Sequence, residues 1–308
     1  MASLHVCDAH THFFSRQFFD LLSGQAAQAR GLSGVGAEGI LPGVLEQTGI
    51  ELPDPSPRKH AERWLSELDR HGVDKAVTFA SLPAEAEAVR EACESSGGRL
   101  IPFLLVDPTS AAGIDTGRRA LAEKGFRGIL LFPAMQKFDP ADASLTPLYD
   151  EAAARRAPVI VHCGILAIKL RDLLGLRPSY DLRYANPLAV IAAAERHRET
   201  TFVIPHFGGG FLREALIAGA QSPNIFVDTS SSNSWTPVEG TTLEEVFRRA
   251  LGVFGPRRIL FGTDSSTFPR GWRAEILTEQ RRIIAAMGLD EADEARIFGG
   301  NLLELLGP

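Results

Sequence analysis

The sequence is poor in cysteine, with only Cys7, Cys93 and Cys163 among its 308 residues. These three form no CxxC pair and no regular spacing, which excludes a disulfide-stapled fold and a zinc site made of thiolates. All three are therefore expected to be reduced, buried thiols. A chain of this length can bury a large core without covalent staples.

The sequence also lacks an excess of positive charge and any long apolar run. Lysine and arginine number 32 against 38 acidic residues, for a net charge of −6, which excludes a nucleic-acid binder that works by neutralising phosphates. No apolar stretch is long enough to cross a bilayer. Residues 1–5 do not combine a basic start with an apolar segment, so no secretory signal is expected and a cytoplasmic protein is predicted.

What the sequence does contain is a regular alternation of short apolar runs and segments with helical periodicity. The runs are nearly continuous in apolar character, which is typical of parallel strands covered on both sides. The strands are predicted at 4–8, 75–80, 100–106, 128–132, 158–162, 201–206, 224–228 and 258–264. The helices are predicted at 57–71, 82–96, 110–124, 144–156, 187–198, 211–221, 242–254 and 271–287. Eight such pairs predict a distorted (β/α)8 TIM barrel, with an open doubly wound sheet as the alternative.

Three segments exceed the minimal repeat, and each follows a predicted strand. They are residues 14–56, 164–186 and 229–241, after strands one, five and seven. In a barrel they would emerge on the face where enzymes of this fold build their sites. The tail, from 290 to 307, is predicted to be a short helix, a Gly-Gly-Asn break at 299–301 and a final helical turn. We find no linker or repeat, so residues 1–308 are expected to form one domain.

Polar residues mark the ends of four predicted strands. His10 and His12 end the first, His162 the fifth, His206 the sixth and Asp264 the eighth. Side chains along an extended backbone alternate between its two sides, so both imidazoles of an HxH pair point the same way. Closure of the barrel would bring strand eight beside strand one, and Asp264 beside the two histidines.

Together these side chains predict a metal site made of nitrogen and oxygen ligands. Such ligands suit one divalent ion, first Zn²⁺, with Mn²⁺, Co²⁺ or Fe²⁺ as alternatives. Each residue has a simpler interpretation: a lone histidine at a strand end is usually a hydrogen-bonded core residue, and Asp264 can be a turn former. The joint pattern favours the metal.

At these residues the sequence resembles the amidohydrolase superfamily, in particular its amidohydrolase-2 branch, the aminocarboxymuconate-semialdehyde-decarboxylase-like family. The resemblance spans nearly the whole chain, through Asp8-Ala-His-Thr-His12, Val159-Ile-Val-His-Cys-Gly164, Ile204-Pro-His-Phe-Gly-Gly209 and Ile259-Leu-Phe-Gly-Thr-Asp264. It implies a metal at the mouth of a distorted barrel.

The resemblance also implies roles for the residues that match its motifs. His10, His12, His162 and Asp264 look like the ligands of a single divalent metal, and His206 like the histidine that orients water. Relatives with two metals carry a lysine or glutamate on the fourth strand. This chain has Gly128-Ile-Leu-Leu-Phe-Pro133 there, so a bridged pair of metals is not expected.

The predicted function is hydrolysis of a small carbonyl, ester, lactone or amide substrate by water activated at the metal, with Asp264 as general base and His206 as its helper. The alternative is non-oxidative decarboxylation of an unsaturated or aromatic acid, and a non-catalytic metal-binding barrel is a third interpretation. No nucleic-acid or membrane partner is expected. Relatives often dimerise, so a homodimer is expected. Residues predicted to bind substrate, in loops after the strands, are Phe14, Arg177, Tyr180, Trp235 and Arg270.

Overall fold

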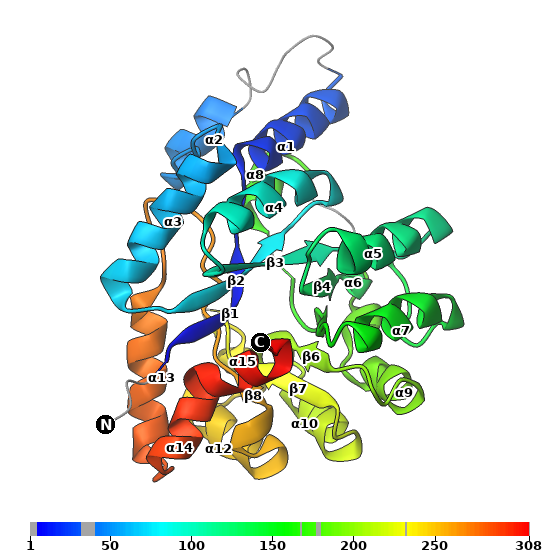
Figure 1. Cartoon of the computed structure of the whole chain (residues 1–308), viewed down its shortest axis with the longest axis vertical. Helices are drawn as coiled ribbons and strands as arrows, with labels where there is room; N and C mark the ends of the chain where they lie inside the picture. The colour runs from blue at the N-terminus through cyan, green and yellow to red at the C-terminus, as the bar shows by residue number, and fades with distance from the viewer. Residues whose placement is uncertain (1–4, 32–40, 167, 177–179, 232, 308) are drawn as a thin grey trace.

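The computed structural model describes residues 5–31, 41–166, 168–176, 180–231 and 233–307. Its centre is one eight-stranded sheet of parallel strands in the order β1 to β8 (Figure 1). The strands are β1 (Cys7–His12), β2 (Lys75–Ala80), β3 (Leu100–Leu105), β4 (Gly128–Leu131), β5 (Val159–Val161), β6 (Phe202–Ile204), β7 (Ile225–Asp228) and β8 (Ile259–Leu260).

The helices surround this sheet, as expected of a (β/α)8 barrel (Figure 1). They are α1 (Arg16–Ala29), α2 (Leu41–Thr48), α3 (Pro57–His71), α4 (Ala86–Ser95), α5 (Ala111–Glu123), α6 (Pro133–Gln136), α7 (Thr146–Ala154), α8 (Lys169–Leu173), α9 (Leu188–Arg196), α10 (Leu212–Gln221), α11 (Thr236–Glu239), α12 (Leu243–Phe254), α13 (Ala274–Ala286), α14 (Glu291–Ala295) and α15 (Asn301–Leu306). Short 3₁₀ turns occur at Pro83–Glu85, Ala143–Leu145, Leu182–Ala185, Pro205–Gly208 and Pro256–Arg258. The barrel prediction is therefore confirmed.

The first strand and the segment after β8 close the barrel. Backbone hydrogen bonds join Ala9 N to Phe261 O and Asp264 N to His10 O, both at 2.8 Å. Thr11 and Ser265 form a parallel bridge one step further along. The two ends of the sheet are thus neighbours, as the predicted convergence of His10 with Asp264 requires.

The strands are buried on both sides, with a period of two. One set of alternate residues, which includes Phe79 and Phe103, fills the barrel interior together with Leu302 and Leu306 of α15. The other set, which includes Ile129 and Val227, packs beneath the surrounding helices. This double burial explains why the strands read as continuous apolar runs.

The segment after β1, residues 14–56, is predicted only as an insertion with no helix assigned to it, and the structure differs. It contains α1 and α2. Ser15 caps α1 by accepting a hydrogen bond from the Phe18 amide. The buried residues of α1 recur with helical spacing, but half of them are small: they are Phe18, Phe19, Leu22, Ser23, Ala26 and Ala27. The small residues weaken the apolar signal.

The insertions after β1 and β5 pack on each other. Phe19 and Leu22 of α1 and Leu170 of α8 belong to one apolar cluster, separate from the two clusters of the barrel itself. Arg30 also donates a hydrogen bond from Nη2 to the Leu174 carbonyl at 3.2 Å. A second small core therefore sits beside the ends of these strands.

The tail also corrects the prediction. No break interrupts it at 299–301: a π-helical turn at Arg296–Gly300 connects α14 directly to α15. Asn301 instead anchors the tail, because its side-chain amide donates to the carbonyls of Pro256 at 2.7 Å and Ile259 at 2.8 Å.

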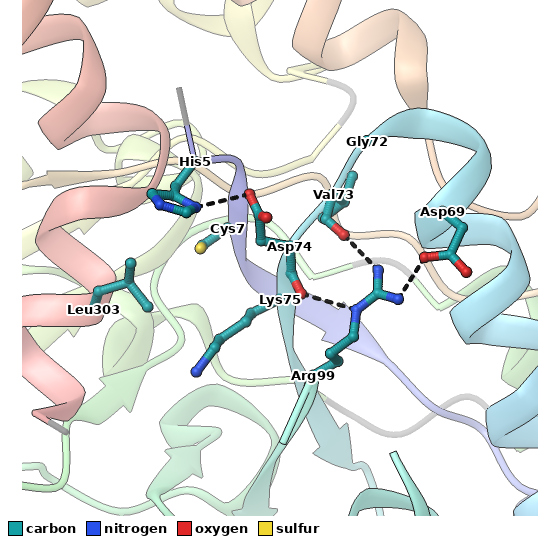
Figure 2. Close-up of a pocket in the computed structure, with 9 residues that line it drawn as sticks. All are labelled: His5, Cys7, Asp69, Gly72, Val73, Asp74, Lys75, Arg99 and Leu303. Atoms are coloured by element: carbon teal, nitrogen blue, oxygen red, sulfur yellow. Dashed lines mark hydrogen bonds and ion pairs between the residues drawn. The ribbon is translucent and has the colours of Figure 1, made fainter. Parts of the chain in front are cut away.

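A pocket of about 590 Å³ opens at the end of the barrel where β1 and β2 begin (Figure 2). Its charged groups largely bind each other: His5 lies 3.4 Å from Asp74, and Arg99 pairs with Asp69. Leu303 of α15 forms another part of its wall. This pocket faces away from the strand ends that carry the histidines.

The three cysteines are buried and unpaired, as predicted. Within the described ranges, no helix combines the length and the apolar composition that crossing a membrane requires.

Candidate metal centre

His10 and His12 point into the barrel because β1 carries a bulge. Between Asp8 and Thr11 the strand has one residue more than its partner β2. Cys7 and Ala9 face the interior before the bulge, so uninterrupted alternation would turn His10 outward. After it, His10 and His12 contact the interior ring of Phe79, with centroids 4.7 and 5.2 Å away.

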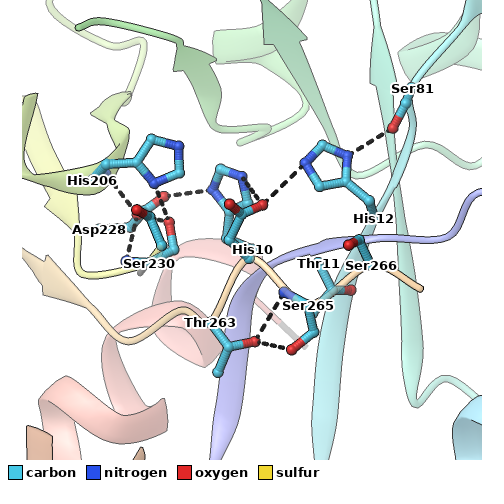
Figure 3. A network of polar contacts seen from close by, with 12 residues as sticks. His10, Thr11, His12, Ser81, His206, Asp228, Ser230, Thr263, Ser265 and Ser266 are labelled. Atoms are coloured by element: carbon cyan, nitrogen blue, oxygen red, sulfur yellow. Dashed lines mark hydrogen bonds and ion pairs between the residues drawn. The ribbon is translucent and has the colours of Figure 1, made fainter. Parts of the chain in front are cut away.

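The same two histidines converge on Asp264. Nitrogen and oxygen atoms of His10, His12 and Asp264 that can bind a metal lie within 4.8 Å of one another. Nε2 of His10 lies 3.9 Å from Asp264 Oδ1, and Nε2 of His12 lies 3.4 Å from the same oxygen. The rings of His10 and His12 lie next to each other, with centroids 5.6 Å apart (Figure 3).

Glycine at position 262 gives His10 the room it needs. A Cβ at this position would come within 2.9 Å of the Ser230 Cβ and 3.0 Å of the His10 Cβ. The first distance is shorter than real Cβ contacts and the second is tighter than most of them, so a side chain here would displace Ser230 or His10. The glycine of the Gly-Thr-Asp sequence is therefore part of the site's construction.

The ring nitrogen that points away from Asp264 is hydrogen-bonded in both His10 and His12. His10 Nδ1 lies 2.9 Å from Asp228 Oδ2, and His12 Nδ1 lies 2.7 Å from Ser81 Oγ. Such outer contacts orient the rings of metal-binding histidines. The Asp228 carboxylate, at the end of β7, is fully buried and is not among the residues predicted for the site. The rule that found Asp264, a carboxylate at the end of a strand, would have found it too.

The electrostatics keep both carboxylates ionised. Burial opposes ionisation of Asp264, but its contacts with His12 and His10 outweigh burial and lower the pKa of this carboxyl. Burial likewise opposes ionisation of Asp228, yet the charge and hydrogen bond of His10 lower its pKa to about 2. Two carboxylates therefore face this group of histidines.

His206 stands beside His10, with ring centroids 4.8 Å apart. Its Nδ1 lies 2.8 Å from Ser230 Oγ. The backbone has positive φ at His206 (56°) and at Asp264 (57°), a conformation that costs side-chain-bearing residues about 1–3 kcal/mol each. Two of the predicted site residues thus sit on strained turns directly after their strands.

His162 is buried next to this group but is not one of its closest members. Its ring stacks on Phe132 at 4.7 Å and lies 5.3 Å from the ring of His206. Burial, together with the charges of His206 and His10, holds the pKa of His162 well below its usual value, so the imidazole is neutral. Its Nδ1 is buried and has no hydrogen-bond partner among the described residues.

These features fit a divalent cation. Two imidazole Nε2 atoms and a carboxylate oxygen converge, no thiolate is among them, and a neighbouring buried imidazole nitrogen remains unsatisfied. Zinc, manganese and related ions accept this donor set. His10, His12 and Asp264 would hold the ion, with His162 as the predicted fourth ligand.

The residues predicted to bind substrate are spread more widely. Phe14 stacks on His12 with centroids 5.0 Å apart, which places it at the site. Arg270 is exposed and donates from Nη2 to Ser266 Oγ at 2.9 Å. Trp235 is buried against the loop after β6, its Cβ 3.9 Å from where a side chain at Gly210 would begin.

The remaining two candidates lie in the insertion after β5. Tyr180 is half-buried and precedes Asp181, whose amide donates to the carbonyl of Ala134 in α6. This contact places Tyr180 beside the segment that follows β4. Arg177 lies outside the described residues.

Comparison with known families decides the relationship. A family model described as amidohydrolase matches residues 7–307. The chain belongs to this amidohydrolase family. The comparison with curated proteins finds no match.

Solved structures share the fold of this amidohydrolase over almost the whole chain. A 5-carboxyvanillate decarboxylase from Novosphingobium aromaticivorans, complexed with manganese and 4-hydroxy-3-methoxy-5-nitrobenzoic acid, is 15% identical, with a TM-score of 0.64 over 99% of this chain and 96% of that one. A probable 2-pyrone-4,6-dicarboxylic acid hydrolase from Acinetobacter baumannii, with citric acid bound, is 13% identical, with a TM-score of 0.63 over 99% and 100%.

A third structure, an amidohydrolase from Burkholderia multivorans with bound zinc, is 15% identical, with a TM-score of 0.59 over 98% and 99% of the two chains. At such identities the likeness establishes the shared barrel. The neighbours include a decarboxylase and a probable hydrolase, and two of them hold a metal.

Proposed function

We propose that the protein is a metal-dependent hydrolase of a small substrate with a carbonyl, ester, lactone or amide group. The observation that carries this proposal is the convergence of His10 Nε2, His12 Nε2 and Asp264 Oδ1 at the mouth of the barrel. When bound there, a divalent cation supplies Lewis-acid chemistry, which polarises a carbonyl and lowers the pKa of water.

The side chains of the site divide the remaining work. Asp264 is ionised and partly exposed, so its carboxylate accepts a proton from water and returns it to the leaving group. His206 lies beside His10 and accepts a hydrogen bond from the attacking water, which orients it. Phe14 forms an apolar wall against His12.

Decarboxylation of an aromatic or unsaturated acid is the second candidate, and one feature favours it. Phe132 stacks on His162 and Phe14 stacks on His12, so flat aromatic surfaces flank the histidines. Such surfaces suit a planar substrate. Arg270, in the loop after β8, is a cation available to a carboxylate.

Removal of predicted ligands tests the metal site that both candidate functions require. His10→Ala and His12→Ala each delete one imidazole ligand, so we expect metal content after purification to fall below a tenth of the wild-type value, measured by inductively coupled plasma mass spectrometry. His5→Ala, which removes an exposed histidine at the other end of β1, is the matched control. Full metal content in both site variants would overturn the proposed site.

Product analysis separates the two reactions. The zinc- and manganese-loaded protein is incubated with lactones, esters and dihydroxybenzoates in ¹⁸O-labelled water. Hydrolysis incorporates one labelled oxygen into the product acid, whereas decarboxylation releases CO₂ and leaves the remaining substrate oxygens unlabelled. Release of CO₂ with no label in the remaining product would replace the hydrolase proposal by the second candidate.

A further inference from the structure

We infer that Asp228 and Ser230 are positioning residues that fix the tautomers of two site histidines together: Asp228 fixes His10 directly, and Ser230 relays the same carboxylate to His206. The inference rests on the proposed roles of His10 as a ligand and His206 as a group that faces the substrate. It adds a function for two buried residues of β7 and its following loop.

The Asp228 carboxylate is the centre of this network (Figure 3). Its Oδ2 lies 2.9 Å from His10 Nδ1. Its Oδ1 accepts hydrogen bonds from the backbone amides of His206 and Ser230, both at 3.0 Å, and from the Ser230 hydroxyl. Asp228 and Ser230 are completely buried, so water does not compete for these contacts.

The direction of each proton follows from what the groups can donate. An ionised carboxylate has no proton, so Asp228 only accepts, and His10 must carry its proton on Nδ1. The serine hydroxyl has a single proton, which it donates to Asp228. Its oxygen is then the acceptor for His206 Nδ1 at 2.8 Å, so His206 also carries its proton on Nδ1.

A neutral imidazole has one N–H and one lone pair. In its neutral form with the proton on Nδ1, each of these rings carries its lone pair on Nε2. For His10 this is the nitrogen that faces Asp264, where a metal ligand needs a lone pair. For His206 it is the nitrogen that is not bound to Ser230 and is free to accept a hydrogen bond or a proton. The opposite tautomer would present an N–H at each of these places.

The other two histidines are not fixed in this way. His12 Nδ1 contacts Ser81 Oγ, and this hydroxyl can act as donor or acceptor. Ser81 binds Glu85 through its backbone amide, so that contact does not fix the direction of the hydroxyl proton. His162 Nδ1 has no hydrogen-bond partner among the described residues. The relay therefore predicts a definite tautomer at two of the four rings.

Nitrogen NMR measures the tautomers directly. The full-length, metal-free protein is labelled with ¹⁵N in its histidine rings and recorded at pH 8, with the His10 and His206 signals assigned from His10→Gln and His206→Gln variants. We expect both rings to show a protonated Nδ1, and His206 also to show an unprotonated Nε2. A protonated Nε2 at His206 in the wild-type protein would overturn the inference.

Two variants separate the direct contact from the relay. Ser230→Ala should release His206 into a mixture of tautomers and leave His10 unchanged. Asp228→Asn should change at least one ring, because an amide that accepts at one end donates at the other. Ser81→Ala is the matched control: it removes a serine from His12 and should leave both signals in place. An unchanged His206 signal in Ser230→Ala would refute the relay even if Asp228→Asn failed to fold.

Zinc titration of the same variants adds a second readout. Asp228→Asn should weaken zinc binding about 10–100-fold, the usual effect of losing an outer partner of a ligand histidine, whereas Ser230→Ala should retain the wild-type Kd. The NMR result stands whether or not any substrate is turned over. Absence of zinc binding in the wild-type protein would instead overturn the proposed function while leaving the tautomer assignment intact.

Discussion

Small residues matter in this site as much as the ligands do. Gly262 follows β8 beside Ser230 and His10, and a methyl group there would come within 3.0 Å of the Cβ atoms of both. The strained backbone at Asp264, two residues later, turns that carboxylate toward the histidines. The position of a ligand thus depends on the absence of a side chain nearby.

Gly262→Ala is expected to damage the site more than the fold. Displacement of His10 should weaken zinc binding by at least 10-fold, measured by isothermal titration calorimetry. Gly252→Ala is the control, because that glycine lies exposed on α12 with nothing within 4 Å of the added carbon. The control should raise the free energy of unfolding by up to about 1 kcal/mol. Equal zinc affinity in both variants would contradict the packing argument.

Much of the site was predictable from residue positions alone. Polar residues at strand ends identified His10, His12 and Asp264, and barrel closure predicted that they meet. The direction of His10 was not predictable, because it depends on a bulge that adds one residue between Asp8 and Thr11. No periodic pattern in the sequence marks that insertion, and Asp228 was missed although its position follows the same rule.

At the scale of elements, the strands were predicted better than the insertions. Strand cores are buried on both sides and carry a strong apolar signal, so each predicted strand overlaps an observed one. Several are shorter than predicted, and the first lies at Cys7–His12 rather than at 4–8, because its second half is polar. Helix α1 was missed because Ser23, Ala26 and Ala27 occupy half of its buried face. Small side chains bury well against a neighbouring helix but do not stand out in a sequence.

Helix α15 closes the end of the barrel opposite the candidate metal centre. Leu302 is 3% exposed and belongs to the interior cluster, so Leu302→Ala should lower the free energy of unfolding by about 2–5 kcal/mol. Leu305→Ala, on the half-buried side of the same helix, should cost less. Urea unfolding measures both, and an equal effect would show that α15 does not plug the barrel.

At the scale of the whole molecule, buried acids make stability depend on pH. Burial raises the pKa of Glu85 to about 7 and that of Asp8 to about 6. Both values exceed those of the unfolded chain, so these groups favour folding fully at low pH and lose that contribution as the pH rises through the folded pKa. Asp228 has the opposite sign: its lowered pKa stabilises the fold above about pH 4.

Glu85→Gln tests the larger of these effects. The side chain accepts hydrogen bonds from the amides of Ser15 and Ser81, so the variant is expected to be less stable at pH 5. Between pH 5 and pH 8, however, its free energy of unfolding should fall by about 3 kcal/mol less than that of the wild type, because position 85 no longer has a carboxylate that must ionise in the core. Urea unfolding at each pH measures the slope.

Glu62→Gln, at an exposed position of α3, provides the comparison for this slope. It should follow the wild-type profile throughout the range. A wild-type slope in Glu85→Gln as well would show that the pH dependence originates elsewhere in the molecule.

The closure of β1 against the segment after β8 also orders events during synthesis. A chain emerging from the ribosome presents His10 and His12 well before Asp264, and the backbone bonds that join β1 to the segment around Asp264 form only after β8 has been made. A truncated chain would offer two imidazoles without their carboxylate. The candidate ligand set is therefore complete only after synthesis has passed β8, so occupancy of the proposed site would report that the barrel has closed.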